Sequence, residues 1–256
     1  MKGPTSFADH FSALAAQYAT WRPHYPPALF DAIAAHLPSP PLQVWEAGCG
    51  SGQATLDLAR RFGRVFATDP SAAQIDAHAA RQTPDHDVVL AVEPAEVCSL
   101  PDASVDLVAV GQALHWFDRE RFFAECERVL RAGGVLAAWC YQDFMAPPDV
   151  AAAIGDFRDR IAPHWPPERI DVDSGYADYA WPFAPGSVID LDMTADWTLP
   201  HLLGYLSSLS ATACATRATG TDPLEHHAPA IAAAWGAAEI SRSIVWPVKL
   251  IVRKSS

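Results

Sequence analysis

Short apolar runs alternate with amphipathic segments through the middle of the chain. The stretches between the runs have helical periodicity or turn residues, and the runs themselves are too short for helices. Strands that alternate with helices form βαβ units, whose strands lie parallel in one sheet. The pattern therefore predicts an α/β fold whose first five strands are parallel. These strands are expected at residues 42–47, 64–69, 87–93, 104–111 and 135–141.

The helical segments and the last strands follow from the same periodicities. Arg131-Ala-Gly-Gly is expected to form the turn that ends the helix at 118–130, because glycine readily takes the left-handed conformation. Pro247 indicates an edge strand or a bulge, because proline has no N–H for a ladder bond. The other helices are expected at 7–18, 27–36, 72–80, 199–210 and 223–235, and two further strands at 187–194 and 244–252.

These elements divide the chain into four parts. Residues 1–41 form an N-terminal helical cap, and residues 42–143 form a Rossmann-like core that binds a ligand. Residues 144–186 are rich in proline and aromatic residues and fit neither period, so we expect a lid inserted over the mouth of the sheet. Residues 187–256 complete the core with strands six and seven.

Composition excludes several classes of protein. The formal net charge is −12, with 30 acidic and 18 basic residues, which disfavours binding to nucleic acid. No apolar run approaches the roughly 18 residues of a membrane span, and the first residues lack a secretory signal, so we expect a cytoplasmic protein without membrane contact. The 5 cysteines are widely spaced, which argues against disulfides and structural zinc.

A glycine-rich turn, Gly48-Cys49-Gly50-Ser51-Gly52, follows the first predicted strand. Its glycines let the backbone approach a ligand at the carboxyl edge of the sheet. A dinucleotide-binding turn would place its third glycine at position 53, where this chain has Gln53. Glu46 precedes the turn by two residues, and its carboxylate suits the cationic ammonium of a methionine moiety. The alternative is that Glu46 only ties down the loop.

Two further acidic positions follow the next strands. Asp69, at the end of the second strand, is placed to accept hydrogen bonds from ribose hydroxyls. Its alternative role is to cap the helix after Pro70, for which Ser71 is also suited. Ala95 and Glu96 follow the third strand and are candidates for contact with an adenine edge; the alternative for Glu96 is a surface turn.

Four segments of the chain together resemble the class I methyltransferases, in the branch of trans-aconitate methyltransferase-like proteins (methyltransferase type 11 family). The resemblance implies a seven-stranded Rossmann-like sheet, mostly parallel, with the last strand antiparallel between the fifth and sixth. It also implies S-adenosyl-L-methionine across the carboxyl ends of strands one to four. One departure is Ala132, where relatives usually have proline, and it affects only the turn. The matching segments are 11–26, 44–52, 95–108 with 111–118, and 128–139.

The resemblance assigns roles to individual residues. It places the glycine turn beneath the cofactor, Asp69 and Pro70 at the ribose, and Ala95 and Glu96 at the adenine. Gln112 and His115 are implied to lie beside the transferred methyl, and Trp116 to line the acceptor pocket. The N-terminal lid matches at Tyr18 and Arg22, expected to meet the cofactor, and at Tyr25, expected to meet the acceptor.

The function expected is therefore methyl transfer from S-adenosylmethionine to a small molecule, such as a carboxylic acid that is methylated on oxygen. A general base is needed only if the acceptor is protonated, and His115 is the candidate. The alternative for His115 is a wall of the pocket, packed with Trp116 and Phe117. The aromatic insertion could equally enclose a ring-shaped acceptor. An acid acceptor requires cations, and the candidates are Arg22, Arg158, Arg160, His164, Arg169, His201 and Arg217.

Three rival functions remain. A non-catalytic protein that binds S-adenosylmethionine or S-adenosylhomocysteine would share the glycine turn, although Gln112, His115 and the lid favour turnover. An NAD-dependent oxidoreductase would be stabilised by NADH instead. A nucleic-acid methyltransferase is disfavoured, because Gly111-Gln-Ala-Leu-His replaces the Asn/Asp-Pro-Pro-aromatic run that holds a flipped base. No acids cluster around Gln112, so no metal is expected, and the sequence indicates no particular oligomeric state.

Overall fold

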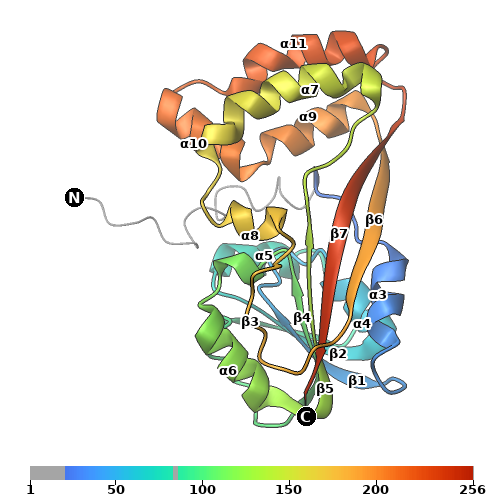
Figure 1. The fold of residues 1–256 in the computed structure, drawn as a ribbon, viewed down its shortest axis with the longest axis vertical. Coiled ribbons are helices and arrows are strands. Elements are labelled where there is room, and N and C mark those ends of the chain that lie inside the picture. The colour runs from blue at the N-terminus through green and yellow to red at the C-terminus, as the bar shows by residue number, and fades with distance from the viewer. Residues whose placement is uncertain (1–20, 83–85, 256) are drawn as a thin grey trace, which may run out of the picture.

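The computed structural model of the chain describes residues 21–82 and 86–255. Seven strands form one sheet with the order β3-β2-β1-β4-β5-β7-β6 (Figure 1). The first five strands are parallel to one another, and β7 runs antiparallel between β5 and β6, so the predicted fold is confirmed. The strands are β1 (Leu42–Ala47), β2 (Gly63–Asp69), β3 (Val88–Val92), β4 (Val105–Gly111), β5 (Leu130–Tyr141), β6 (Val188–Trp197) and β7 (Arg242–Lys254).

The segment after the helix at 118–130 corrects the sequence prediction. Arg131-Ala-Gly-Gly does not form a separate turn, because α6 (Arg119–Val129) leads directly into β5. Leu130 already pairs with Val105, and the register then shifts before Val135 pairs with Leu107. Gly133 lies within this irregular stretch and has a φ of +74°, a left-handed conformation that glycine adopts without strain.

Pro247 corrects a second expectation, because β7 is an inner strand and not an edge, and its pairing with β6 continues through Pro247 without a bulge. The carbonyl of Pro247 accepts a hydrogen bond from the backbone N–H of Gln142, just beyond the last residue of β5. In a strand, the N–H and C=O groups of one residue point toward the same neighbouring strand. The N–H that Pro247 lacks would therefore point beyond the last residue of β5, so the β5–β7 ladder loses no hydrogen bond.

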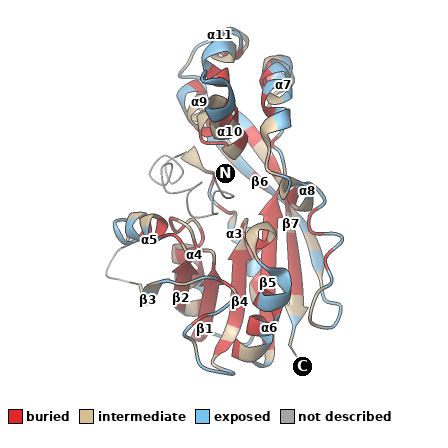
Figure 2. Cartoon of the chain, turned by 90° about the vertical axis from the view of Figure 1, so that its left-hand side faces the viewer, coloured by how far each residue is buried: buried red, intermediate tan, exposed pale blue. Residues whose placement is uncertain are grey.

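Helices cover both faces of the sheet, and Figure 2 shows the strands as its buried centre. On β1, Val44 packs into the apolar cluster under α3 (Pro27–Ala34) and α4 (Thr55–Phe62), while Trp45 packs into the cluster under α6. This alternation is the period of two expected of a strand buried on both sides. α5 (Ala72–Ala79) leads from β2 to β3, where predicted. The predicted helix at 7–18 lies outside the described residues.

A second helical layer stands over the carboxyl ends of the parallel strands (Figures 1 and 2). The insertion supplies α7 (Pro148–Ile161), the short helix η2 (Ala162–His164) and α8 (Arg169–Asp173). Between β6 and β7 the chain adds α9 (Leu199–Ser207), α10 (Ser210–Thr219) and α11 (Pro223–Trp235), of which α10 was not predicted. Ile154 and Phe157 of α7 share a buried cluster with Ile231 of α11. In the part of the chain described, no helix is long and apolar enough to cross a membrane.

Candidate active site

An open cavity of about 710 Å³ lies at the carboxyl ends of β1, β2, β4 and β5. It brings together residues that the sequence analysis drew from four separate segments, because these strand ends meet at one edge of the sheet. The predicted residues that line it are Arg22, Tyr25, Glu46, Gly48, Cys49, Gly50, Asp69, Gln112 and Trp116.

Other predicted residues lie outside this lining. Ser51 and Gly52 are buried within the glycine loop, and Pro70 follows Asp69 at the start of α5 without reaching the cavity wall. Ala95 is buried, and the Glu96 carboxylate accepts a hydrogen bond from the backbone N–H of Asp118. Tyr18 lies outside the described residues. The cofactor contacts expected of these residues stay predictions.

The three glycines of the loop all have positive φ, at +69°, +53° and +87° for Gly48, Gly50 and Gly52. An added Cβ on Gly48 would lie 2.8 Å from Ala113 Cβ, and one on Gly52 would lie 2.5 Å from the His78 ring. These two glycines therefore let the loop pack closely. A Cβ on Gly50 would meet nothing within 4 Å, so this residue presents bare backbone to the cavity.

Asp69 shapes the loop with the same carboxylate that lines the cavity. Its two oxygens accept hydrogen bonds from the backbone N–H groups of Gly50, at 3.0 Å, and Ser71, at 2.9 Å. Ser71, and not Asp69, caps α5 by accepting from Gln74 N. Burial raises the pKa of Asp69, and its two backbone hydrogen bonds oppose that shift.

Glu46 is the second buried carboxyl group of the cavity. Its Oε2 accepts a 2.5 Å hydrogen bond from the hydroxyl of Thr55, the first residue of α4, so Glu46 joins β1 to the helix that follows the glycine loop. Burial raises the pKa of Glu46 to about 8, and the charge of Asp69 adds to the shift, while the Thr55 hydrogen bond opposes it. Two buried acids in one cavity favour a cationic ligand.

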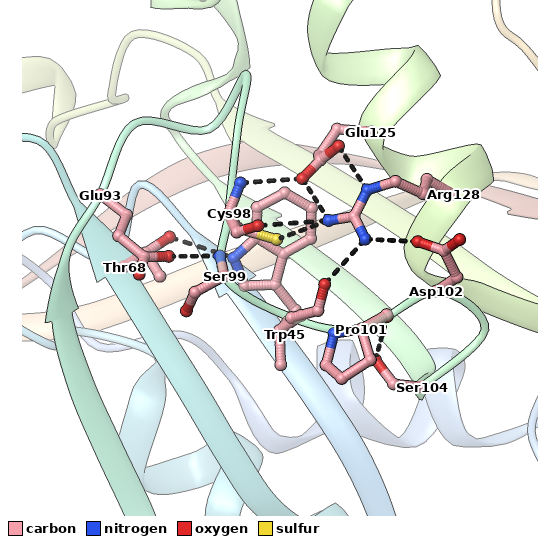
Figure 3. A network of polar contacts seen from close by, with 11 residues as sticks. Trp45, Thr68, Glu93, Cys98, Ser99, Pro101, Asp102, Ser104, Glu125 and Arg128 are labelled. Atoms are coloured by element: carbon pink, nitrogen blue, oxygen red, sulfur yellow. Dashed lines mark hydrogen bonds and ion pairs between the residues drawn. The ribbon is translucent and has the colours of Figure 1, made fainter.

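The segment between β3 and β4, which carries Ala95 and Glu96, is held against α6 by one guanidinium (Figure 3). Arg128 donates to the carboxylates of Glu125 and Asp102 and to the backbone carbonyls of Leu100 and Cys98. Glu125 also accepts from the backbone N–H of Cys98, and Arg128 lowers the pKa of Glu125 to about 2. This network fixes the part of the segment that leads into β4, near the amino ends of β4 and β5.

A second cavity, of about 640 Å³, lies between the sheet edge and the helical layer. It shares four side chains with the first cavity: Arg22, Gln112, Trp116 and Tyr141. Its lining also includes residues of the insertion and of the α9–α10 region, among them Trp165, Arg169, Tyr205 and Leu209. A ligand in one cavity would therefore lie next to a ligand in the other.

His115 lines the second cavity beside Trp116, with ring centroids 4.9 Å apart. Its Nδ1 lies 3.3 Å from the hydroxyl oxygen of Tyr176, a fully buried residue. Burial lowers the pKa of His115 to about 3, and the positive charge of Arg169 contributes. The imidazole is therefore neutral at physiological pH and lines the pocket, and its role as a general base stays a prediction.

Gln112 and Tyr141 join the two cavities through reciprocal hydrogen bonds. The Gln112 amide accepts from Tyr141 N at 2.7 Å and donates to Tyr141 O at 3.2 Å. The Tyr141 hydroxyl accepts from Arg22, which also donates to the carbonyl of Ser208. Gln112 has a φ of +55°, a left-handed conformation that these bonds hold in place.

Sequence reasoning missed several residues of the first cavity. Tyr141 ends the fifth predicted strand, and that position was the signal for it, because carboxyl strand ends bind ligands in this architecture. Gln53 was considered only as a missing glycine, and Gln74 lay within a predicted helix without a motif. The missed lining residues are Pro23, Gln53, Ala54, Gln74, Gly111, Ala113 and Tyr141.

Only two of the candidate cations reach either cavity: Arg22 lines both, and Arg169 lines the second. Arg169 forms an ion pair of 2.6 Å with Asp173 and lies 4.4 Å over the ring of Trp165. Arg158 pairs instead with Asp143, and Arg160 lines a separate surface hollow near α11. Among the described residues, no group of three or more His, Cys, Asp or Glu side chains could hold a metal ion.

Comparisons with known proteins agree with this arrangement. Residues 45–138 match the family model described as a methyltransferase domain. A Dictyostelium discoideum methyltransferase is 32% identical over 225 residues, which are 86% of this chain and 84% of that protein. A Saccharomyces cerevisiae protein named as an S-adenosylmethionine-dependent methyltransferase is 32% identical over 49% of this chain and 45% of its own length.

Solved structures extend the similarity to nearly the whole chain. A methyltransferase from Anaeromyxobacter dehalogenans, described as type II, has a TM-score of 0.82 and 41% identity over 92% of this chain and 98% of its own. A methyltransferase from Bacillus halodurans, with 18% identity and a TM-score of 0.51 over 89% of this chain and 97% of its own, shares the fold.

S-adenosylmethionine fits the first cavity on this structure's own features. The open face of Gly50 admits a ligand close to the backbone, and the buried carboxyl groups of Glu46 and Asp69 suit its ammonium group and its ribose hydroxyls. The chain therefore belongs to the class I S-adenosylmethionine-dependent methyltransferases, in the family defined by the methyltransferase domain.

Proposed function

We propose that the enzyme methylates a carboxylate oxygen of a small-molecule acid bound in the second cavity. Bound S-adenosylmethionine supplies a methyl group on a sulfonium; as the carboxylate oxygen bonds to that methyl, the carbon–sulfur bond breaks and its electron pair stays on sulfur. No proton is lost, and the products are a methyl ester and S-adenosylhomocysteine. The protein's task is to align the two reactants and exclude water.

The single observation that carries the proposal is the contact between the two cavities. Arg22, Gln112, Trp116 and Tyr141 line both, so a cofactor in the first cavity and an acid in the second would meet at these side chains. Gln112 and Tyr141 hold each other through two hydrogen bonds, which keeps this junction rigid. A rigid junction supports the alignment that an in-line displacement requires.

The charges of the second cavity favour an acidic acceptor. Arg169 is partly buried there, lies over the ring of Trp165 and pairs with Asp173, whose side chain is 54% exposed. Arg22 also lines the cavity, and the acid of the lining, Asp143, pairs with Arg158, so the lining holds two guanidinium groups against one acid. A guanidinium recognises carboxylates through paired N–H donors. The Tyr141 hydroxyl accepts from Arg22 and can donate its own proton to the acceptor.

The state of His115 also favours an acceptor that needs no base. With its pKa lowered to about 3, His115 would take a proton poorly from an alcohol or an ammonium group. A carboxylate is already deprotonated at neutral pH. The imidazole then serves to shape the pocket, held by its contact with Tyr176.

The experiment is transfer of labelled methyl to a panel of acids, each paired with its primary amide. The acids should accept label and the amides should not, because the amide lacks the anionic nucleophile.

Arg169→Met should raise KM for the acid about tenfold or more, because the variant loses a charged hydrogen bond to the acceptor. Its affinity for the cofactor should change little. Arg160→Met, an exposed arginine outside both cavities, is the matched control and should behave as wild type. Equal labelling of acids and amides, or an unchanged KM in Arg169→Met, would refute the proposal.

A further inference from the structure

The interface between the glycine loop and α5 holds polar atoms that have no hydrogen-bond partner. They are Gln53 Nε2, Gln74 Oε1 and both ring nitrogens of His78, all buried. Other polar groups at this interface are paired: the Ser51 hydroxyl bonds to Gln53 Oε1 at 3.2 Å, and Arg81 donates to the Ser51 carbonyl at 3.0 Å. Buried donors and acceptors without partners are rare in native proteins, so this cluster requires an explanation.

Two of the three residues line the cofactor cavity, and the third does not. Gln53 and Gln74 are part of its wall together with Gly50 and Asp69, whereas His78 packs behind Gly52. Gln74 is only 5% exposed and stands in the first turn of α5, where its backbone N–H donates to the Ser71 cap. The Gln53 amide is therefore held by the Ser51 hydroxyl, and the Gln74 amide is enclosed by its surroundings.

An unpaired buried amide destabilises the protein that carries it, because it has lost its hydrogen bonds to water. An apolar side chain of similar size would fill the same space without this cost. Buried polar groups of this kind persist where a ligand supplies their missing hydrogen-bond partners. The unliganded site is then less stable, and ligand binding satisfies these groups.

We propose that Gln53 and Gln74 are cofactor-binding residues of this methyltransferase. Gln74 Oε1 accepts a hydrogen bond from an O–H or N–H group of the adenosine half, because Gln74 lies in the first turn of the helix that follows Asp69. Gln53 Nε2 donates to an oxygen or ring nitrogen of the cofactor. His78 supports the loop from behind and takes no part in binding. The inference concerns the cofactor alone and is independent of the acceptor.

The test is to replace each amide with an apolar side chain of similar length, in Gln74→Met and Gln53→Met. Titration calorimetry with S-adenosylhomocysteine should show about five- to tenfold weaker binding in each, the loss of one neutral hydrogen bond. The Tm of the unliganded variants should equal or exceed that of wild type, because an unpaired amide has been removed. For Gln74→Met, 5′-methylthioadenosine should lose affinity by the same factor, since it keeps the adenosine half.

Gln82→Met is the matched control, because Gln82 Nε2 is also buried without a partner but the residue lines neither cavity. Its unliganded Tm should respond in the same way, and its affinity for S-adenosylhomocysteine should not change. The proposal is overturned if Gln74→Met and Gln53→Met bind as wild type, or if their Tm falls along with their affinity, which would indicate a structural role. Gln74→Leu provides a second shape, and failure of both Gln74 variants to fold would equally refute it.

Discussion

The hydroxyl of Thr55 donates a 2.5 Å hydrogen bond to the carboxyl group of Glu46, and this bond joins the first turn of α4 to the end of β1. Both residues are buried, and Glu46 lines the cofactor cavity. Burial raises the pKa of Glu46 to about 8, so the unliganded enzyme holds a proton there at neutral pH. A cationic ligand beside Glu46 would favour its ionised form, which couples cofactor binding to release of a proton.

Cofactor binding should therefore release close to one proton per enzyme at pH 7. Calorimetric titration with S-adenosylhomocysteine in buffers of different protonation enthalpy counts this proton, because the observed heat changes in proportion to it. Glu46→Gln should abolish the release, since the amide cannot ionise, and should weaken binding. Thr55→Val removes the bond that opposes the pKa shift, so release should persist to higher pH. Equal proton release in wild type and Glu46→Gln would contradict the assignment.

The same carboxyl group should make the unliganded enzyme less stable as the pH rises. Glu46 has its ordinary pKa of 4.5 in the unfolded chain and about 8 in the folded one, so between these values the folded state holds a proton that the unfolded state has lost. Raising the pH through this window lowers the free energy of unfolding, by up to about 1.4 kcal/mol per pH unit. Urea unfolding from pH 5 to 8 measures it, and the difference between wild type and Glu46→Gln isolates the contribution. A difference that does not vary with pH would contradict the prediction.

The elements that sequence patterns predicted well are those with one dominant period. β1, β2 and β4 are buried strands between turn residues, and the predicted bounds of β1 agree with the structure. α7 was not predicted, because Pro148 and the alanines of its exposed face mask the stripe formed by Val150, Ile154 and Phe157. Its partners lie in α10 and α11, far along the chain, and no local pattern reveals that packing.

The cofactor site was predictable where a motif fixes the backbone and not where a side chain acts alone. The glycine loop and Asp69 follow strands directly, so their place at the sheet edge was expected. Gln74 reaches the same cavity from inside a helix, and only the tertiary structure brings it there, whereas Tyr141 could have been inferred from its place at the end of the fifth strand. The second cavity depends on Arg169 in the insertion. Arg169 was one of seven candidate cations for an acid acceptor, and no pattern in the sequence distinguished it from the other six.

The glycine loop should respond differently to the same substitution at two positions. Gly50→Ala adds a methyl group in open space, so it should cost only the left-handed strain of about 1 to 2 kcal/mol, while it weakens binding of S-adenosylhomocysteine. Gly52→Ala drives its Cβ to 2.5 Å from the His78 ring and should lower the Tm further. Thermal unfolding compares the two, and in a His78→Ala background the extra loss at Gly52 should shrink. Equal losses of Tm at both positions would contradict the packing described.

His115 should act without changing its charge during turnover. With its pKa lowered to about 3 by burial and by Arg169, kcat for an acid acceptor should stay level from pH 6 to 8, with no limb near the ordinary histidine value. His115→Asn should keep most of the activity, because an amide can occupy the same polar position beside Tyr176.

In Arg169→Met one of the two causes of the lowered His115 pKa is lost, so NMR titration of the imidazole should find a higher pKa than in wild type. Arg160→Met, the control outside both cavities, should leave it unchanged. A tenfold fall in kcat per pH unit below 6.5, removed by His115→Asn, would instead identify His115 as a general base.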